Sequence, residues 1–266
     1  LFIVLFLLGF GLIMIYSASS YAAFEEFGDA AHYLKRQAIA SVLGLIAMIV
    51  VANVPYHFWE KFALLGYLVS AVLIVLVLSP LGVESHKARR WIAIPGTGFN
   101  IQPAEVAKLC MILFLAVLVC KMGKSIRTMK GFIFMVLAPL PIAGMIYLIT
   151  DNLSSAIIVM GISVLMVFVA SPDYKKFIVL AVFVVAVAAL LIYLITSTDL
   201  IGGFRSGRIL AWLDPESDAQ DKGFQTLQAL YAIGSGGIWG KGLGQSMQKL
   251  SFLPEAQNDM IFSIIC

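Results

Sequence analysis

Hydrophobic residues fall in long uninterrupted runs along this chain, and short polar segments separate them. Seven runs of roughly 16 to 20 residues are long enough to cross a bilayer as α-helices. Backbone polar groups in lipid must be paired within their own element, so we interpret every run as a helix. The runs are 1–18, 38–54, 62–81, 106–120, 132–149, 153–170 and 177–195, and an eighth begins at Met260. The pattern predicts an all-α integral membrane protein, a polytopic helical bundle of seven spans plus the start of an eighth.

Two features inside these runs predict how the helices are interrupted. Pro139 and Pro141 should kink the fifth run, because proline removes a helical hydrogen bond. Only Asp151 and Asn152 separate the fifth run from the sixth. Together the two runs are too long for one span, so we expect a tight helical hairpin there. The opening run is interpreted as a span, and a secretory signal is the alternative.

Composition narrows the class of protein further. The chain is 61% hydrophobic and 12% charged with a mean hydropathy of +0.97, which excludes a soluble enzyme and a disordered linker. A transmembrane barrel is excluded because its strands would alternate in polarity. The net charge of +3 is too small to favour nucleic-acid binding. The three cysteines lie inside apolar runs and show no disulfide framework.

The charged residues divide unequally between the two sides of the membrane. If alternate loops share a side, one side carries seven basic and two acidic residues, and the other carries eleven and thirteen. The first side, at +5, should be cytoplasmic. Two long polar segments, 82–105 and 196–259, then lie outside the cell, and loops of the second one's length are usually functional. We expect a single domain over 1–266 that contains the extracytoplasmic loop 196–259.

The first candidate site precedes and enters the fourth span. Arg89, Arg90 and Trp91 are followed by Gln102-Pro103-Ala104-Glu105 and then Lys108. Glu105 and Lys108 are three residues apart, so they share a helix face and can pair just inside the membrane. One interpretation is an interfacial anchor, with the tryptophan in the aromatic belt. The other is a binding site for an anionic lipid headgroup, because charges within a span are costly and usually functional.

Two further segments of the long loop are candidates. Residues 204–216 contain Arg205 and Arg208 and could form a short helix on the membrane surface. Residues 223–249 are rich in glycine and include Lys241 and Lys249, but they do not match the phosphate-binding loop. We expect their glycines to adopt positive φ and to allow close backbone approach in a re-entrant loop.

The last candidate is Asp259, the final polar residue before the eighth run. It should lie at the outer membrane surface or slightly below it, where burial would raise its pKa toward that of a general base. The alternative is a helix N-cap. The three histidines lie in different loops without ligand spacing, so the sequence indicates no metal site.

Taken together, these motifs resemble the SEDS family, which includes RodA, FtsW and SpoVE. The resemblance rests on segments 88–92 and 102–108, Ile233-Gly234-Ser235-Gly236-Gly237, and Leu253-Pro254-Glu255 followed by Asp259. Segment 242–249 is more similar to the FtsW and SpoVE branch than to RodA. The resemblance implies ten membrane helices and a peptidoglycan glycosyltransferase of the bacterial cytoplasmic membrane with its active site outside. It also implies lipid II and the growing undecaprenyl-linked glycan strand as substrates, and a class B penicillin-binding protein as partner.

The resemblance also implies roles for individual residues. Asp259 matches the family's essential aspartate and would be the catalytic base that deprotonates the acceptor hydroxyl. The pyrophosphate of the donor would be stabilised by Arg90 and Lys108, with Arg208 or Lys249 as further candidates, and Glu105 would hold Lys108. Gln102 and Glu255 belong to the same motifs and are expected to contact substrate. A divalent cation could share this task, but no ligand cluster in the sequence requires one.

Two alternatives and one departure from the family pattern accompany this interpretation. A lipid II flippase would need a polar path, yet the spans contain almost no ionisable groups besides Glu105 and Lys108. A non-catalytic division scaffold would use the long loop for docking. The family commonly carries Pro-Asp-Leu-Gly between the fifth and sixth helices, where this chain has Asp151-Asn152-Leu153-Ser154. The flippase and the scaffold interpretations both predict that Asp259→Asn leaves activity intact.

Overall fold

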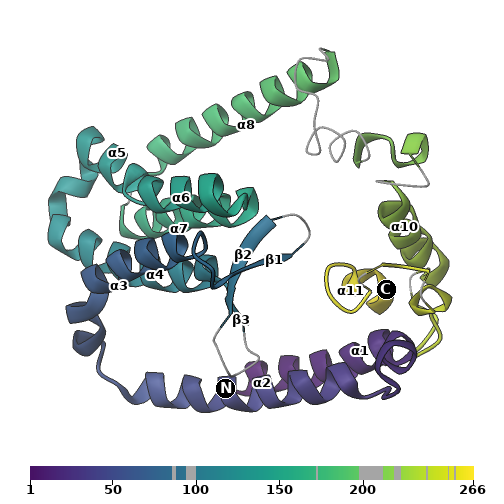
Figure 1. Cartoon of the computed structure of the whole chain (residues 1–266). Helices are drawn as coiled ribbons and strands as arrows, with labels where there is room; N and C mark the ends of the chain where they lie inside the picture. Colours follow the sequence, from purple (N-terminus) through teal and green to yellow (C-terminus); the bar gives the residue numbers. More distant parts are fainter. Residues whose placement is uncertain are drawn as a thin grey trace. The chain divides into compact units, whose positions relative to one another are not determined.

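The computed structural model describes residues 1–85, 88–93, 100–171, 173–197, 212–218, 223–237, 239–250, 252–254 and 256–266 (Figure 1). The chain divides into two compact units. A terminal unit comprises residues 1–53 and 185–266, and a central unit comprises residues 54–184. We describe each unit by itself.

Within the described residues, seven helices are long and apolar enough to cross a membrane, as the hydrophobic pattern predicts. Polar residues extend several helices beyond their apolar runs, so that α1 continues to Phe27 instead of ending at residue 18, and α2 begins at His32 instead of residue 38. The spans are α1 (Phe2–Phe27), α2 (His32–Asn53), α3 (Tyr56–Leu76), α4 (Pro103–Met122) with the 3-10 helix η1 (Gly123–Arg127), α5 (Met129–Leu137) with α6 (Leu140–Thr150), α7 (Leu153–Ala170) and α8 (Tyr174–Ser197).

The fifth span is broken at its prolines, as predicted. Helix α5 ends at Leu137, and α6 begins at Leu140 after Pro139. Pro139 has no N–H, so the carbonyl four residues earlier, that of Met135, loses its helical donor. The buried hydroxyl of Ser163 on α7 donates to that carbonyl at 2.5 Å. The neighbouring helix therefore supplies the hydrogen bond that the proline removes.

Helices α6 and α7 form the expected tight hairpin at Asp151 and Asn152. Asp151 ends α6 in the left-handed conformation, with φ 47° and ψ 40°. It is the one non-glycine residue with positive φ in the described part of the chain. Asn152 caps α7, its side-chain oxygen accepting a hydrogen bond from the Ser155 amide at 3.0 Å. An aspartate suits the first position because aspartate and asparagine tolerate the left-handed conformation. An asparagine suits the second because its side chain can accept a hydrogen bond from a nearby backbone amide.

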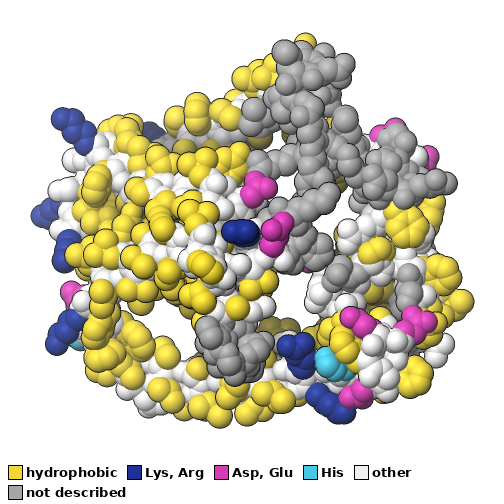
Figure 2. Space-filling view, in the orientation of Figure 1, with side chains coloured by type: hydrophobic (Ala, Val, Ile, Leu, Met, Phe, Trp, Pro, Cys, Tyr) yellow, Lys and Arg dark blue, Asp and Glu magenta, His cyan; other side chains and the backbone are white. Residues whose placement is uncertain are grey.

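The central unit is built around α4, which packs against α3 and α7. Its core includes Met111, Leu115, Ile142, Ile146 and Val159, all at most 1% exposed. Hydrophobic side chains also cover much of its outer surface (Figure 2), as expected for helices that face lipid.

A small antiparallel sheet in the central unit was not predicted. Its strands are β1 (Gly82–Ser85), β2 (Ala88–Ala93) and β3 (Asn100–Ile101), in the order β1-β2-β3. These strands are short and polar, so they lack the regular alternation that would identify them in the sequence. The sheet matters for the site because β2 contacts both α4 and α6.

In the terminal unit, α1 packs against α2 and against α11 (Ile261–Ile265). Helix α10 (Phe224–Gly236) also packs on α11, and two 3-10 helices, η3 (Pro215–Asp218) and η4 (Met247–Lys249), contact α10. Helix α10 lies within the segment 196–259 that the hydrophobic pattern predicts as loop. Its 13 residues span about 20 Å, which is too short to cross a bilayer.

Candidate functional site

Asp259 lies in the terminal unit, in the turn that leads into α11. Its carboxylate is exposed and forms no hydrogen bond or ion pair with the described part of the chain. The described part of the polypeptide does not itself bury this carboxylate. The N-cap alternative is wrong, because Met260 holds that position and no side chain caps the helix.

The turn that carries Asp259 is held in place by buried side chains and by a backbone hydrogen bond. Leu253 and Ala256 are buried in a small core with Ala18 of α1 and Ile264 of α11. The amide of Leu253 donates to the Gln248 carbonyl at 3.1 Å. The exposed aspartate is thus held by apolar neighbours on a packed turn, which fixes its backbone while leaving its side chain accessible.

The glycine-rich segment behaves as predicted. Gly237, Gly240, Gly242 and Gly244 all have positive φ. A Cβ on Gly236 would lie 2.4 Å from the carbonyl oxygen of Cys266, so only glycine allows this approach of backbone to backbone. Lys249 ends η4 after this segment, and its side chain lies outside the described part.

In the central unit, Arg90 reaches from β2 to the α6–α7 hairpin. Its Nε donates to the Thr150 carbonyl at 3.3 Å, and its Nη2 donates to the Asp151 carbonyl at 2.9 Å. These carbonyls end α6, where helical donors run out and the helix dipole is negative. A guanidinium has five N–H groups, so three remain for another acceptor.

The predicted pairing of Glu105 and Lys108 is confirmed. Lys108 Nζ lies 2.7 Å from Glu105 Oε1. Pro103 occupies the first turn of α4 and Gln102 is its N-cap residue, so both carboxylate and ammonium lie close to the helix start. The Lys108 side chain is 20% exposed and that of Glu105 is 58% exposed. The pair therefore places a half-buried cation beside an accessible carboxylate.

The comparisons with known proteins agree with these motifs. The model of the FtsW, RodA and SpoVE family, described as cell cycle proteins, matches residues 1–266. The chain belongs to this family. It is 38% identical to a probable peptidoglycan glycosyltransferase FtsW of Geobacter metallireducens, covering 96% of this chain and 66% of that protein. It is 36% identical to stage V sporulation protein E of Bacillus subtilis, covering 99% and 70%.

Solved structures show the same fold for this FtsW/RodA/SpoVE family member. One, described as a peptidoglycan synthase complex that coordinates polymerisation and crosslinking, aligns with a TM-score of 0.67 and 29% identity. It covers 90% of this chain and 66% of the matched chain. A mutant of the rod-shape-determining protein RodA of Thermus thermophilus aligns with a TM-score of 0.55 at 21% identity, covering 98% and 92%. The protein is therefore a multi-pass membrane protein, and it spans about two thirds of the length of its FtsW relative.

Some predicted site residues of this family member cannot be placed. Arg208 and Glu255 lie outside the described residues. So does most of the expected surface helix over 204–216, of which Trp212, Leu213 and the start of η3 are described as helical.

No three His, Cys, Asp or Glu side chains gather as metal ligands among the residues that the structure describes. We assign no catalytic step to a divalent cation.

The two carbonyls that Arg90 binds are not predicted by the sequence. The available signal was the pair Asp151-Asn152 between two apolar runs, which marks a helix end with unpaired carbonyls. Identifying Arg90 as their donor requires knowing that β2 lies against α6, and the sequence does not indicate this contact.

Proposed function

We propose that the full-length protein is a peptidoglycan glycosyltransferase that polymerises lipid II at the outer face of the cytoplasmic membrane. Membership of the family supports this, as do the relatives named probable peptidoglycan glycosyltransferase. The observation that carries the mechanism is the exposed carboxylate of Asp259 on its packed turn. Such a group can receive a proton from a hydroxyl of a membrane-bound substrate without first breaking an internal ion pair.

In the proposed step, Asp259 takes the proton from the 4-hydroxyl of the acceptor sugar. The hydroxyl oxygen attacks the anomeric carbon of the donor, and the bond from that carbon to the lipid pyrophosphate breaks with inversion. One carboxylate suffices, because a pyrophosphate leaving group needs less protonation than the alcohol released in glycoside hydrolysis. The products are a longer glycan strand and undecaprenyl pyrophosphate.

The basic residues of the central unit would stabilise the charge that develops on the pyrophosphate. Lys108 is half-buried and held by Glu105, so its ammonium is positioned before substrate arrives. Arg90 is fixed by two carbonyls and keeps three N–H groups for phosphate oxygens. Gln102 at the start of the same helix, together with Arg208, Lys249 and Glu255, completes the proposed set of substrate-binding residues.

The proposed orientation places the lysine-rich connections in the cytoplasm. Lys61, Lys121, Lys124 and Lys176 lie near helix ends that the predicted topology assigns to one side, and basic residues favour the cytoplasmic side. Asp259 and the Glu105–Lys108 pair then face outward. The family resemblance supports a class B penicillin-binding protein as the partner, in division, elongation or sporulation.

The test is polymerisation of purified lipid II by the full-length protein with its penicillin-binding partner. We expect Asp259→Asn to lower the rate by at least about a hundred-fold, the usual contribution of a general base. Glu216→Gln is the matched control, because Glu216 is an exposed carboxylate of the same loop segment and should keep the wild-type rate. Thermal melting of both variants checks that the fold is retained.

The outcomes separate the proposal from its alternatives. Glycan strands from wild type and Glu216→Gln but not from Asp259→Asn support a glycosyltransferase whose base is Asp259. Equal strands from all three remove Asp259 from the chemistry. No strands from any of them, together with lipid II transport in vesicles, would favour a flippase.

A further inference from the structure

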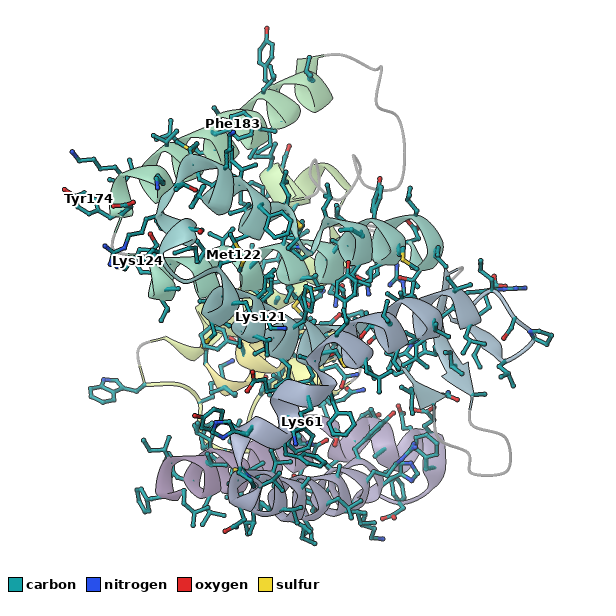
Figure 3. All side chains as sticks on the ribbon, turned by 90° about the vertical axis from the view of Figure 1, so that its left-hand side faces the viewer. Lys61, Lys121, Met122, Lys124, Tyr174 and Phe183 are labelled. Carbon is teal, nitrogen blue, oxygen red and sulfur yellow. The ribbon has the colours of Figure 1, made fainter. Side chains whose placement is uncertain are left out.

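A cavity of about 530 Å³ lies between α3 and α4 in the central unit, at the lysine-rich ends of the two helices. Its lining combines charged residues with apolar ones. The charged or polar members are His57, Glu60, Lys61 and Lys121, and the apolar members are Ala63, Leu64, Phe114, Val117 and Leu118. Figure 3 looks onto this end of the central unit and labels Lys61 on α3 and Lys121 on α4.

The two lysines of this cavity have no anionic partner in the described part of the chain. Lys108 and Lys176 each pair with a carboxylate, at 2.7 and 3.0 Å respectively. Lys61 and Lys121 form no such pair, although Glu60 also lines the cavity. The lining therefore carries a net charge of +1 with two ammonium groups available to one ligand.

The apolar wall extends from the lysines toward the middle of the spans. Phe114 of the lining contacts Tyr67 of α3, with ring centroids 4.5 Å apart and ring planes tilted by 35°. A Cβ on Gly66 would lie 3.2 Å from Cys110 Sγ, so α3 and α4 are in close contact there. Helices α3 and α4 therefore touch beyond the cavity, and the lining residues Leu64 and Leu118 lie within the spans.

We propose that this cavity binds one anionic phospholipid whose headgroup is a phosphodiester with an uncharged, hydroxyl-bearing end, as in phosphatidylglycerol. The phosphate would lie between Lys61 and Lys121, and a hydroxyl could donate to Glu60. The upper part of an acyl chain would lie against Leu64, Phe114 and Leu118. In the orientation proposed above, the lipid belongs to the cytoplasmic leaflet.

Charge and depth together favour a lipid over other anions. A soluble phosphate would gain nothing from the apolar wall, whereas the lining places two ammonium groups beside hydrophobic side chains of the spans. A lipid satisfies both halves of the lining, because basic pockets between membrane helices bind anionic headgroups while chains remain in hydrocarbon. A zwitterionic lipid would offer an additional ammonium to a site that is already positive.

The test is native mass spectrometry of the full-length protein titrated with phosphatidylglycerol or phosphatidylethanolamine of identical acyl chains. We expect wild type to retain one phosphatidylglycerol with at least about five-fold preference. Lys61→Gln with Lys121→Gln should weaken its binding about 25-fold, at roughly a factor of five for each lysine near an anionic group. The matched control is Lys124→Gln with Lys130→Gln, which removes the same charge outside the cavity and should cost less than about five-fold.

Three results would overturn the proposal. One is equal retention of the two lipids by wild type, which would leave the lysines to a protein partner. Another is equal loss in the cavity and control variants. The third is displacement of the lipid by glycerophosphoglycerol alone, which would identify a soluble ligand. If the double variant is not monodisperse, Lys61→Gln and Lys121→Gln are measured singly. This test is independent of polymerase activity.

Discussion

Arg90 is expected to hold the α6–α7 hairpin closed, and replacing it should loosen that hairpin locally. Its guanidinium donates to the two carbonyls that end α6, at 3.3 and 2.9 Å. Hydrogen bonds from charged groups contribute about 1.5 to 3 kcal/mol each. One bond is long and the site is partly exposed, so we take about 2 kcal/mol for both together.

That magnitude predicts a measurable change in hydrogen exchange. A loss of about 2 kcal/mol in local stability should speed exchange of the hairpin amides about 30-fold in Arg90→Ala. Arg90→Lys should give an intermediate rate, because an ammonium cannot donate in the fork geometry that reaches both carbonyls. The readout is deuterium uptake by a peptide covering residues 146–156, which includes the Ser155 amide bound by Asn152.

The control is Arg89→Lys on the same strand. Arg89 pairs with Glu84 at 3.9 Å through an exposed side chain, so this change should leave the hairpin peptide unaltered. Wild-type uptake in Arg90→Ala would refute the bracing role. Equal acceleration in the Arg89 and Arg90 variants would instead indicate a general effect of the sheet.

Two further predictions concern other ion pairs. Glu105→Gln should lower the polymerisation rate roughly ten- to hundred-fold, because it would misplace Lys108. The double variant Glu105→Gln/Lys108→Gln should be no slower than Lys108→Gln alone. Additive losses would show that the two residues act separately. Asp29, between α1 and α2, has its pKa lowered by hydrogen bonds from Lys35 and the Ala31 amide. A lowered folded-state pKa means that its stabilisation is present above the unfolded value of about 3.9 and is lost as pH falls through the folded value. Asp29→Asn should therefore melt below wild type at pH 7, and the difference should shrink as the pH falls below the unfolded value of about 3.9. A difference that does not change with pH would contradict this.

The spans could be predicted from the sequence because each rests on one local property, an apolar run of sufficient length. The break at Pro139 and the turn at Asp151 are equally local, since both follow from the conformations that these residue types allow. The pairing of Glu105 with Lys108 needs only the helical spacing of three residues.

Features that depend on contacts distant in sequence could not be predicted. The bond from Arg90 to Asp151 joins residues 61 positions apart and depends on where the sheet lies. Helix α10 was missed because its apolar positions are interspersed with glutamine and glycine, so its signal is weaker than that of a span. The exposure of Asp259 within the polypeptide also depends on such contacts, because its turn packs through Leu253 and Ala256 and leaves the carboxylate at the surface.

The hydrogen bond from Ser163 to Met135 has a consequence for how this membrane domain can evolve. The serine is needed because Pro139 leaves a carbonyl unpaired in a region without water. If the proline were replaced first, the serine would lose its importance as a donor; if the serine were lost first, a bare carbonyl would remain in the core of the unit. The two positions are therefore epistatic. Ser163 can be replaced without cost only after Pro139 has been replaced, because the Ser163 hydroxyl is the donor to the Met135 carbonyl.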